Sequence, residues 1–207
     1  MSADAYTTLR AFGSAELIER KSRFLGYAMP VKTEEEALSF LQKIRSEHRD
    51  AKHNVYAYQI ANGNLMRYSD DGEPQGTAGL PVLDVIRKNA FTDAILVVTR
   101  YFGGILLGTG GLVRAYSAAA KAAVQAAQIV TYVPYSVCKL YCSYAEYPRL
   151  ESDLARLSVR IDQVDYAEEI SLTLAMPSVQ YNPFCDHIKE ITGGKRVPVL
   201  LGTRYDA

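Results

Sequence analysis

Five apolar residues in a row, Ala94–Val98, lead into a glycine-rich segment and then into an alanine-rich stretch over residues 112–127. Short apolar runs with β-branched residues are typical of strands that are buried on both faces. The stretch 112–127 contains no glycine or proline, and its alanine, leucine and valine content favours helix. We therefore expect a buried strand, a glycine-rich turn and a helix, with the rest of the chain arranged around them.

Five glycines lie within nine residues at this turn. Glycine adopts positive φ angles and allows other groups close to the backbone, and the free N–H groups at a helix N-terminus attract anions. The spacing fits neither the P-loop pattern nor the dinucleotide-binding pattern. Two interpretations stay open: a purely structural turn, or an anion-binding loop flanked by Arg100 and Arg114. The glycines are Gly103, Gly104, Gly108, Gly110 and Gly111.

The charges of the chain are unevenly distributed. The formal net charge is zero, so the total gives no sign of a nucleic-acid partner. However, residues 94–145 contain no aspartate or glutamate, whereas Arg100, Arg114, Lys121 and Lys139 all lie within them. A neutral total can conceal a basic face. The pattern predicts a basic surface around the glycine segment.

Three acidic residues lie close together in the polar stretch before the buried strand: Asp70, Asp71 and Glu73. Carboxylate oxygens bind Mg²⁺, so a metal site is one interpretation. A second is a turn in which an aspartate accepts backbone N–H groups and Gly72 takes an unusual φ angle. A third is that these carboxylates pair with Arg100 or Arg114. We favour the turn, and no other set of metal ligands is visible.

The sequence contains no recognisable catalytic motif. It has no nucleophile elbow, zinc-protease helix or cysteine–histidine arrangement, and its three cysteines do not form a disulfide framework. No cofactor is predicted. No apolar stretch is long enough to span a membrane, and the N-terminus does not resemble a signal peptide. We expect a non-catalytic, cytoplasmic protein.

The order of predicted elements changes near Pro134. Before it we expect strand, helix, hairpin, helix, strand and helix, and after it the βαββαβ order of a ferredoxin-like domain. The prediction is an α+β chain with one domain over residues 1–133 and another over 134–207. The expected ranges before Pro134 are 17–28, 33–48, 53–60, 64–68, 78–88, 94–98 and 112–127; those after it are 136–144, 147–157, 159–166, 168–176, 178–191 and 196–201.

Several long motifs occur in a fixed order along the first domain. They occupy residues 21–24 (KSRF), 53–58 (HNVYAY), 68–79 (YSDDGEPQGTAG), 97–104 (VVTRYFGG) and 107–116 (LGTGGLVRAY). These motifs resemble the YigZ/IMPACT family. The resemblance spans about residues 15 to 130, and the last third resembles the small domain that accompanies the bacterial members.

The resemblance implies an N-terminal domain similar to the second domain of a small-subunit ribosomal protein, followed by a ferredoxin-like domain. That pair is similar to the last two domains of elongation factor G. It also implies a place in translational control, since eukaryotic IMPACT proteins compete for a co-activator of the kinase that phosphorylates an initiation factor.

Residues and resemblance together predict a protein that binds RNA or the ribosome and modulates translation. Phosphate contacts are expected from Lys21, Arg23, Arg100, Arg114 and the loop Gly103–Gly111. Two alternatives stay open. One is a Mg²⁺-dependent enzyme or a binder of a small phosphorylated ligand that uses the acidic loop. The other is a protein-interaction module that uses the second domain.

Overall fold

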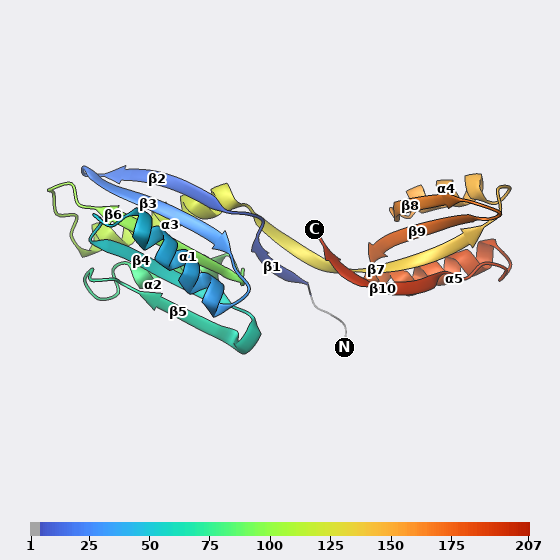
Figure 1. Ribbon diagram of the computed structural model, residues 1–207, viewed down its shortest axis with the longest axis horizontal. Coiled ribbons are helices and arrows are strands. Elements are labelled where there is room, and N and C mark those ends of the chain that lie inside the picture. The colour runs from blue at the N-terminus through green and yellow to red at the C-terminus, as the bar shows by residue number, and fades with distance from the viewer. Residues whose placement is uncertain (1–4) are drawn as a thin grey trace. The chain divides into compact units, whose positions relative to one another are not determined.

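The computed structural model describes residues 5–207, which divide into two compact units with a boundary between residues 131 and 132 (Figure 1). Both units combine helices with strands, so the predicted α+β class is confirmed. The first unit contains β1 (Tyr6–Leu9), β2 (Gly13–Glu19), β3 (Ser22–Pro30), α1 (Glu34–Glu47), β4 (His53–Ile60), a 3₁₀ turn (Asn62–Asn64), β5 (Leu65–Ser69), α2 (Gly79–Lys88), β6 (Ala94–Tyr101) and α3 (Thr109–Ala127).

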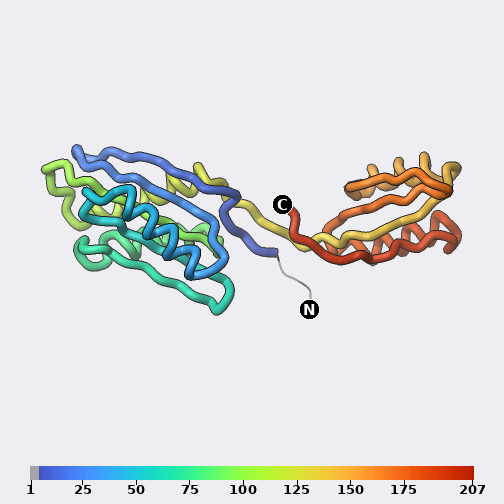
Figure 2. The backbone as a smooth tube through the Cα atoms, viewed as in Figure 1, coloured from blue at the N-terminus to red at the C-terminus, as the bar shows by residue number. Residues whose placement is uncertain are grey.

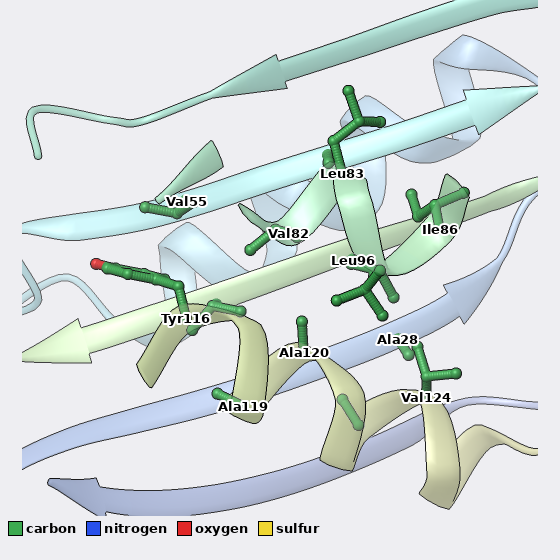
Figure 3. Packing of buried hydrophobic residues seen from close by; sticks show 14 of the residues in the cluster. Ala28, Val55, Val82, Leu83, Ile86, Leu96, Tyr116, Ala119, Ala120 and Val124 are labelled. Carbon is green, nitrogen blue, oxygen red and sulfur yellow. The ribbon is translucent and has the colours of Figure 1, made fainter. Parts of the chain in front are cut away.

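An antiparallel sheet in the order β2-β3-β6-β4-β5 organises the first unit. The predicted buried strand is β6, at its centre. Leu96 and Val98 pack with α2 and α3 on one face, whereas Ile95 and Val97 pack with α1 on the other. Alternation along β6 thus buries both of its faces. Figure 3 shows the α2 and α3 side of this core.

Helix α3 lies very close to β2 and β3. A Cβ atom at Gly26 would lie 2.4 Å from the Ala119 carbonyl oxygen, and one at Gly13 would lie 2.2 Å from the Ala127 nitrogen. The alanine-rich face of the helix therefore rests on glycines of the sheet. This close packing explains the high alanine content of α3, because larger side chains would hold the helix away from the strands.

The single strand expected over residues 17–28 is wrong. A two-residue turn divides this stretch into β2 and β3, which pair with Ile18 opposite Arg23. The turn residues Arg20 and Lys21 have φ angles of 46° and 65°. Such turns usually carry glycine or asparagine, and neither residue occurs here to indicate a turn.

Two other boundaries bear on the candidate site. The predicted strand 94–98 continues to Tyr101, and the helix expected from residue 112 begins at Thr109. Gly110 and Gly111 therefore belong to the first turn of α3. The loop itself covers only residues 102–108.

The second unit has the βαββαβ order that was predicted. Figure 2 follows the backbone into it along β7. In its sheet β7 pairs with β9, β9 pairs with β8, and both β1 and β10 pair with β7. Its two helices cover a core that includes the buried Cys138 and Cys142. Burial raises the pKa of the Cys138 thiol to about 12, so it behaves as an apolar residue. The elements are β7 (Ile129–Cys142), α4 (Tyr147–Arg156), β8 (Arg160–Tyr166), β9 (Ile170–Pro177), a 3₁₀ turn (Ser178–Gln180), α5 (Tyr181–Ile191) and β10 (Val199–Asp206).

No helix among residues 5–207 has both the length and the apolar character needed to cross a membrane.

Candidate functional site

The acidic loop between β5 and α2 is built on Asp70. Its carboxylate accepts the backbone N–H groups of Gly76, Ala78 and Gly79 at distances of 2.8, 3.0 and 2.7 Å. It thereby caps α2 from a distance along the chain, since Ala78 provides no capping side chain. This is the turn interpretation that the sequence favoured.

Asp71 fastens the same loop to two other elements. Its carboxylate accepts a hydrogen bond from Arg45 of α1 at 2.7 Å and from the Asn54 N–H of β4 at 2.6 Å. The residue itself has a φ angle of 46°, and Gly72 follows at 86°. The unusual φ angles therefore extend over two residues, of which only Gly72 was expected.

Glu73 is the buried member of the trio, with 9% of its surface exposed. One carboxylate oxygen, Oε1, accepts from Arg100 at 2.6 Å and from the Tyr116 hydroxyl at 2.7 Å. Burial, and next the hydrogen bond to Glu73, raise the pKa of Tyr116 well above its ordinary value. Tyr116 is thus held as a neutral donor, and Glu73 joins β6 to α3.

Arg100 lies inside the first unit, 6% exposed. Its guanidinium carbon lies 5.5 Å from the ring centres of both Phe24 and Phe102. Its Nε atom has no hydrogen-bond partner in the described chain. The interpretation in which the acidic loop pairs with an arginine therefore holds for Glu73 and Arg100, but not for Arg114. The phosphate contact expected from Arg100 would require Phe102, which covers its guanidinium group, to move.

The three carboxylates thus have separate structural partners. Within residues 5–207 no three histidine, cysteine, aspartate or glutamate side chains are grouped so that they could hold a metal ion. His53 also lies beside the trio, with its Nε2 4.0 Å from Glu73 Oε1. Its Nδ1 lies 2.9 Å from the Asp71 carbonyl oxygen, so Nδ1 carries the proton.

The glycines of the predicted anion loop differ from one another. A Cβ atom at Gly103 would lie 2.0 Å from the Lys21 carbonyl carbon, so this glycine serves the contact with the β2–β3 turn. Gly104 and Gly108 have φ angles of 84° and 72°, and nothing lies within 4 Å of the position of a Cβ atom. Gly110 and Gly111 begin α3, where Gly111 contacts Leu107.

The N-terminus of α3 is open. No side chain of the described residues caps it, and its first turn contains no acidic residue. A groove of about 240 Å³ between α3 and the end of β2 is lined by Arg114 and Arg20, with Glu19 as its single carboxylate. Arg114 was predicted, whereas Arg20 was missed because its turn was read as part of a strand.

The predicted basic residues do not all share one face. Lys21 is exposed in the turn next to Arg20. Arg23, by contrast, forms an exposed ion pair with Glu16 at 2.8 Å and lies over the Tyr101 ring. Since neighbours in a strand point to opposite faces, Arg23 lies away from the α3 side, into which Phe24 packs. The structure brings Arg20 and Arg114 together in the groove, with Lys21 next to Arg20 in the turn, whereas Arg23 lies on the other face.

Comparison with known proteins agrees with the motifs. A family profile described as the Impact N-terminal domain matches residues 20–124, and one for a domain of unknown function matches residues 140–195. The IMPACT family member YvyE of Bacillus subtilis is 35% identical over 192 residues, which cover 92% of this chain and 88% of the relative. YigZ of Escherichia coli is 33% identical over 178 residues, or 84% and 87%.

More distant matches support the same architecture. The protein IMPACT of Oryctolagus cuniculus is 31% identical over 96 residues, which are 44% of this chain and 30% of that protein. A crystal structure of a hypothetical protein matches with a TM-score of 0.61 and 29% identity, over 97% of this chain and 98% of the other. The likeness thus extends over both units.

Proposed function

This chain belongs to the IMPACT family, a family of regulatory, translation-related proteins, and on that premise we propose that it binds RNA, free or in the ribosome, and catalyses no reaction. The open N-terminus of α3 beside Arg20 and Arg114 carries the proposal. Free N–H groups and the positive end of the helix dipole favour an anion there. Two guanidinium groups add charge and donors suited to phosphate.

The size of the groove favours a polymer over a small ligand. At about 240 Å³ it lies below the usual range for sites that enclose a whole small molecule. The groove has room for one phosphate group of an RNA strand, with the rest of the strand lying outside the groove. Lys21 extends the positive charge along the turn. The alternative of a Mg²⁺-dependent site finds less support, because Asp70, Asp71 and Glu73 are already occupied by protein donors.

An exposed aromatic residue complements this surface. Phe102 is 55% exposed, and one face of its ring covers Arg100. Unpaired bases stack on such rings. Within the proposal, Arg100 positions Phe102 from below instead of contacting phosphate. The protein then resembles many RNA-binding proteins in which basic groups contact the backbone and an aromatic ring contacts a base.

Co-sedimentation with ribosomes and with free single-stranded RNA, at low and moderate salt, tests the proposal. The double variant Arg20→Glu/Arg114→Glu is expected to bind at least about tenfold more weakly, and its plot of log affinity against log salt should be shallower by about 1 to 2. The matched control is Arg49→Glu/Arg149→Glu, which changes the net charge equally at two exposed residues outside the groove. Equal losses in both variants, or no association of the wild type at any salt, would refute the assignment.

A further inference from the structure

The two faces of the first sheet are covered unequally. Helices α2 and α3 together cover one face, whereas α1 alone lies on the other, against β4 and β6 (Figure 1). Beside α1, a groove of about 610 Å³ opens where β3 ends and β2 begins. Its volume falls within the range of ligand sites. This groove is separate from the α3 surface and independent of the function proposed above.

The apolar wall of the groove is a fixed set of aromatic rings. Phe12, half exposed, lies against Tyr27 with ring centres 6.5 Å apart and meets the edge of Phe40 at 6.2 Å. Met29 also lines the groove. Because two rings hold Phe12 in place, its free face is available to a ligand without loss of rotamer freedom on binding.

The groove is also lined by the first turn of α1, which carries three glutamates. Two of them have structural partners: Glu34 accepts from the Tyr58 hydroxyl at 2.5 Å, and Glu36 accepts from the Lys32 N–H at 2.6 Å. Glu35 has no such partner among residues 5–207, and it lines the groove together with Glu36. One lysine, Lys43, lies in the lining and 4.0 Å from Glu47.

We propose that this groove binds a basic segment of a partner protein, with an arginine or lysine side chain lying along Phe12 and its charge next to Glu35. Aromatic faces attract cations, and the long apolar stems of these side chains suit Phe12 and Met29. The adjoining carboxylates complement the charged end. The same carboxylates oppose the phosphates of RNA, which distinguishes this groove from the surface beside α3.

A fluorescein-labelled peptide of alternating arginine and leucine tests the assignment by fluorescence anisotropy. Binding is expected for this peptide and not for one in which glutamate replaces arginine. Phe12→Ala and Glu35→Lys are each expected to weaken binding about tenfold, since each removes one half of the cation site. In the wild type, the methyl signal of Met29 should shift as the peptide is added.

The matched control is Asp84→Lys, which makes the same charge change on α2, on the other face of the sheet. It should retain the affinity of the wild type. The proposal is overturned if Asp84→Lys weakens binding as much as Glu35→Lys, if the glutamate peptide binds equally well, or if folded Phe12→Ala retains full affinity. Thermal unfolding followed by circular dichroism checks that each variant is folded.

Discussion

In the first unit the Arg100 guanidinium lies 2.6 Å from Glu73, and both side chains are less than a tenth exposed. In the second unit Arg204 lies 2.7 Å from Asp162 and 2.9 Å from Asp206, and 40% of its side chain is exposed. The distances are similar. The surroundings differ, and so does the cost of losing one partner. A buried charge left alone is strongly destabilising, whereas water takes the place of a partner at the surface.

The two units also differ in how burial protects the bonds that hold their loops. In the first unit the acidic loop is held by the part-buried hydrogen bonds of Asp70 and Asp71 and by the buried bonds of Glu73 to Arg100 and Tyr116. In the second unit Arg196 joins Glu146 and Glu169 at 2.8 Å each, partly in contact with solvent. The acidic residues of the stretch 68–79 thus connect their loop to α1, β4, β6 and α3.

The largest effect is expected from Glu73→Ala. It leaves Arg100 buried without a counter-ion and removes the acceptor of the Tyr116 hydroxyl, which should lower the free energy of unfolding by about 3 to 5 kcal/mol. Urea unfolding followed by NMR signals of the first-unit core measures it, because a chain of two units need not unfold in one transition. The double variant Glu73→Leu/Arg100→Met should recover part of the loss. A loss as small as that at an exposed pair would contradict this comparison.

Asp70→Ala should have the next largest effect. It removes a carboxylate that accepts three backbone N–H groups, so we expect a loss of about 1 to 3 kcal/mol from the first unit. Asp70→Asn keeps one acceptor oxygen and should lose less. The same urea experiment applies, and the second-unit transition serves as the internal control. Equal losses in the two variants would show that the cap depends on charge alone.

Much of the first unit could be predicted from local pattern. The buried run Ala94–Val98 and the alanine-rich helix follow from composition, and the alternation that places Leu96 and Val98 under the helices continues to Arg100. That alternation would have indicated that Arg100 is buried. Pairing of Arg100 with the acidic loop was one of three open interpretations, but the choice of Glu73 over Asp70 and Asp71 could not be predicted, because the position of this loop depends on tertiary contacts. The turn at Arg20 and Lys21 was missed, since neither residue is typical of positive φ angles.

The candidate surfaces show the same limit. Arg114 was predicted from its place after the glycines, but Arg20 joined it only once the hairpin was known. The groove beside α1 had no signal in the sequence, because Phe12 before β2, Met29 in β3 and Glu35 in α1 lie far apart along the chain. Strand alternation also explains why Arg23 lies apart from Arg114. Sequence reasoning thus proposed individual residues but did not place them relative to one another.

A pH titration extends the comparison to the second unit. Glu146 accepts from the Ser143 backbone first of all, and next from Arg196, and these bonds lower its pKa from 4.5 to about 2. A depressed pKa stabilises the fold above the unfolded value and loses that contribution as pH falls through the folded value. The urea midpoint of the second unit should therefore decrease between about pH 4.5 and pH 2. Glu146→Gln should be less stable at neutral pH and should flatten that decrease. An unchanged pH profile would exclude Glu146 as its source.

The smallest effect is expected from Arg204→Ala in β10. Its partners Asp162 and Asp206 also bind Arg160, so neither carboxylate is left alone when Arg204 is lost. Exposed pairs contribute little, and we expect a change of less than about 1 kcal/mol. Added salt should reduce the difference further, because screening weakens exposed charge pairs more than buried ones. Urea unfolding of the second unit at low and high salt measures both effects. A loss as large as that of Glu73→Ala would mean that the ion pairs of Arg160, Arg204, Asp162 and Asp206 are cooperative. Exposure would then no longer explain why the two regions differ in the cost of losing a partner.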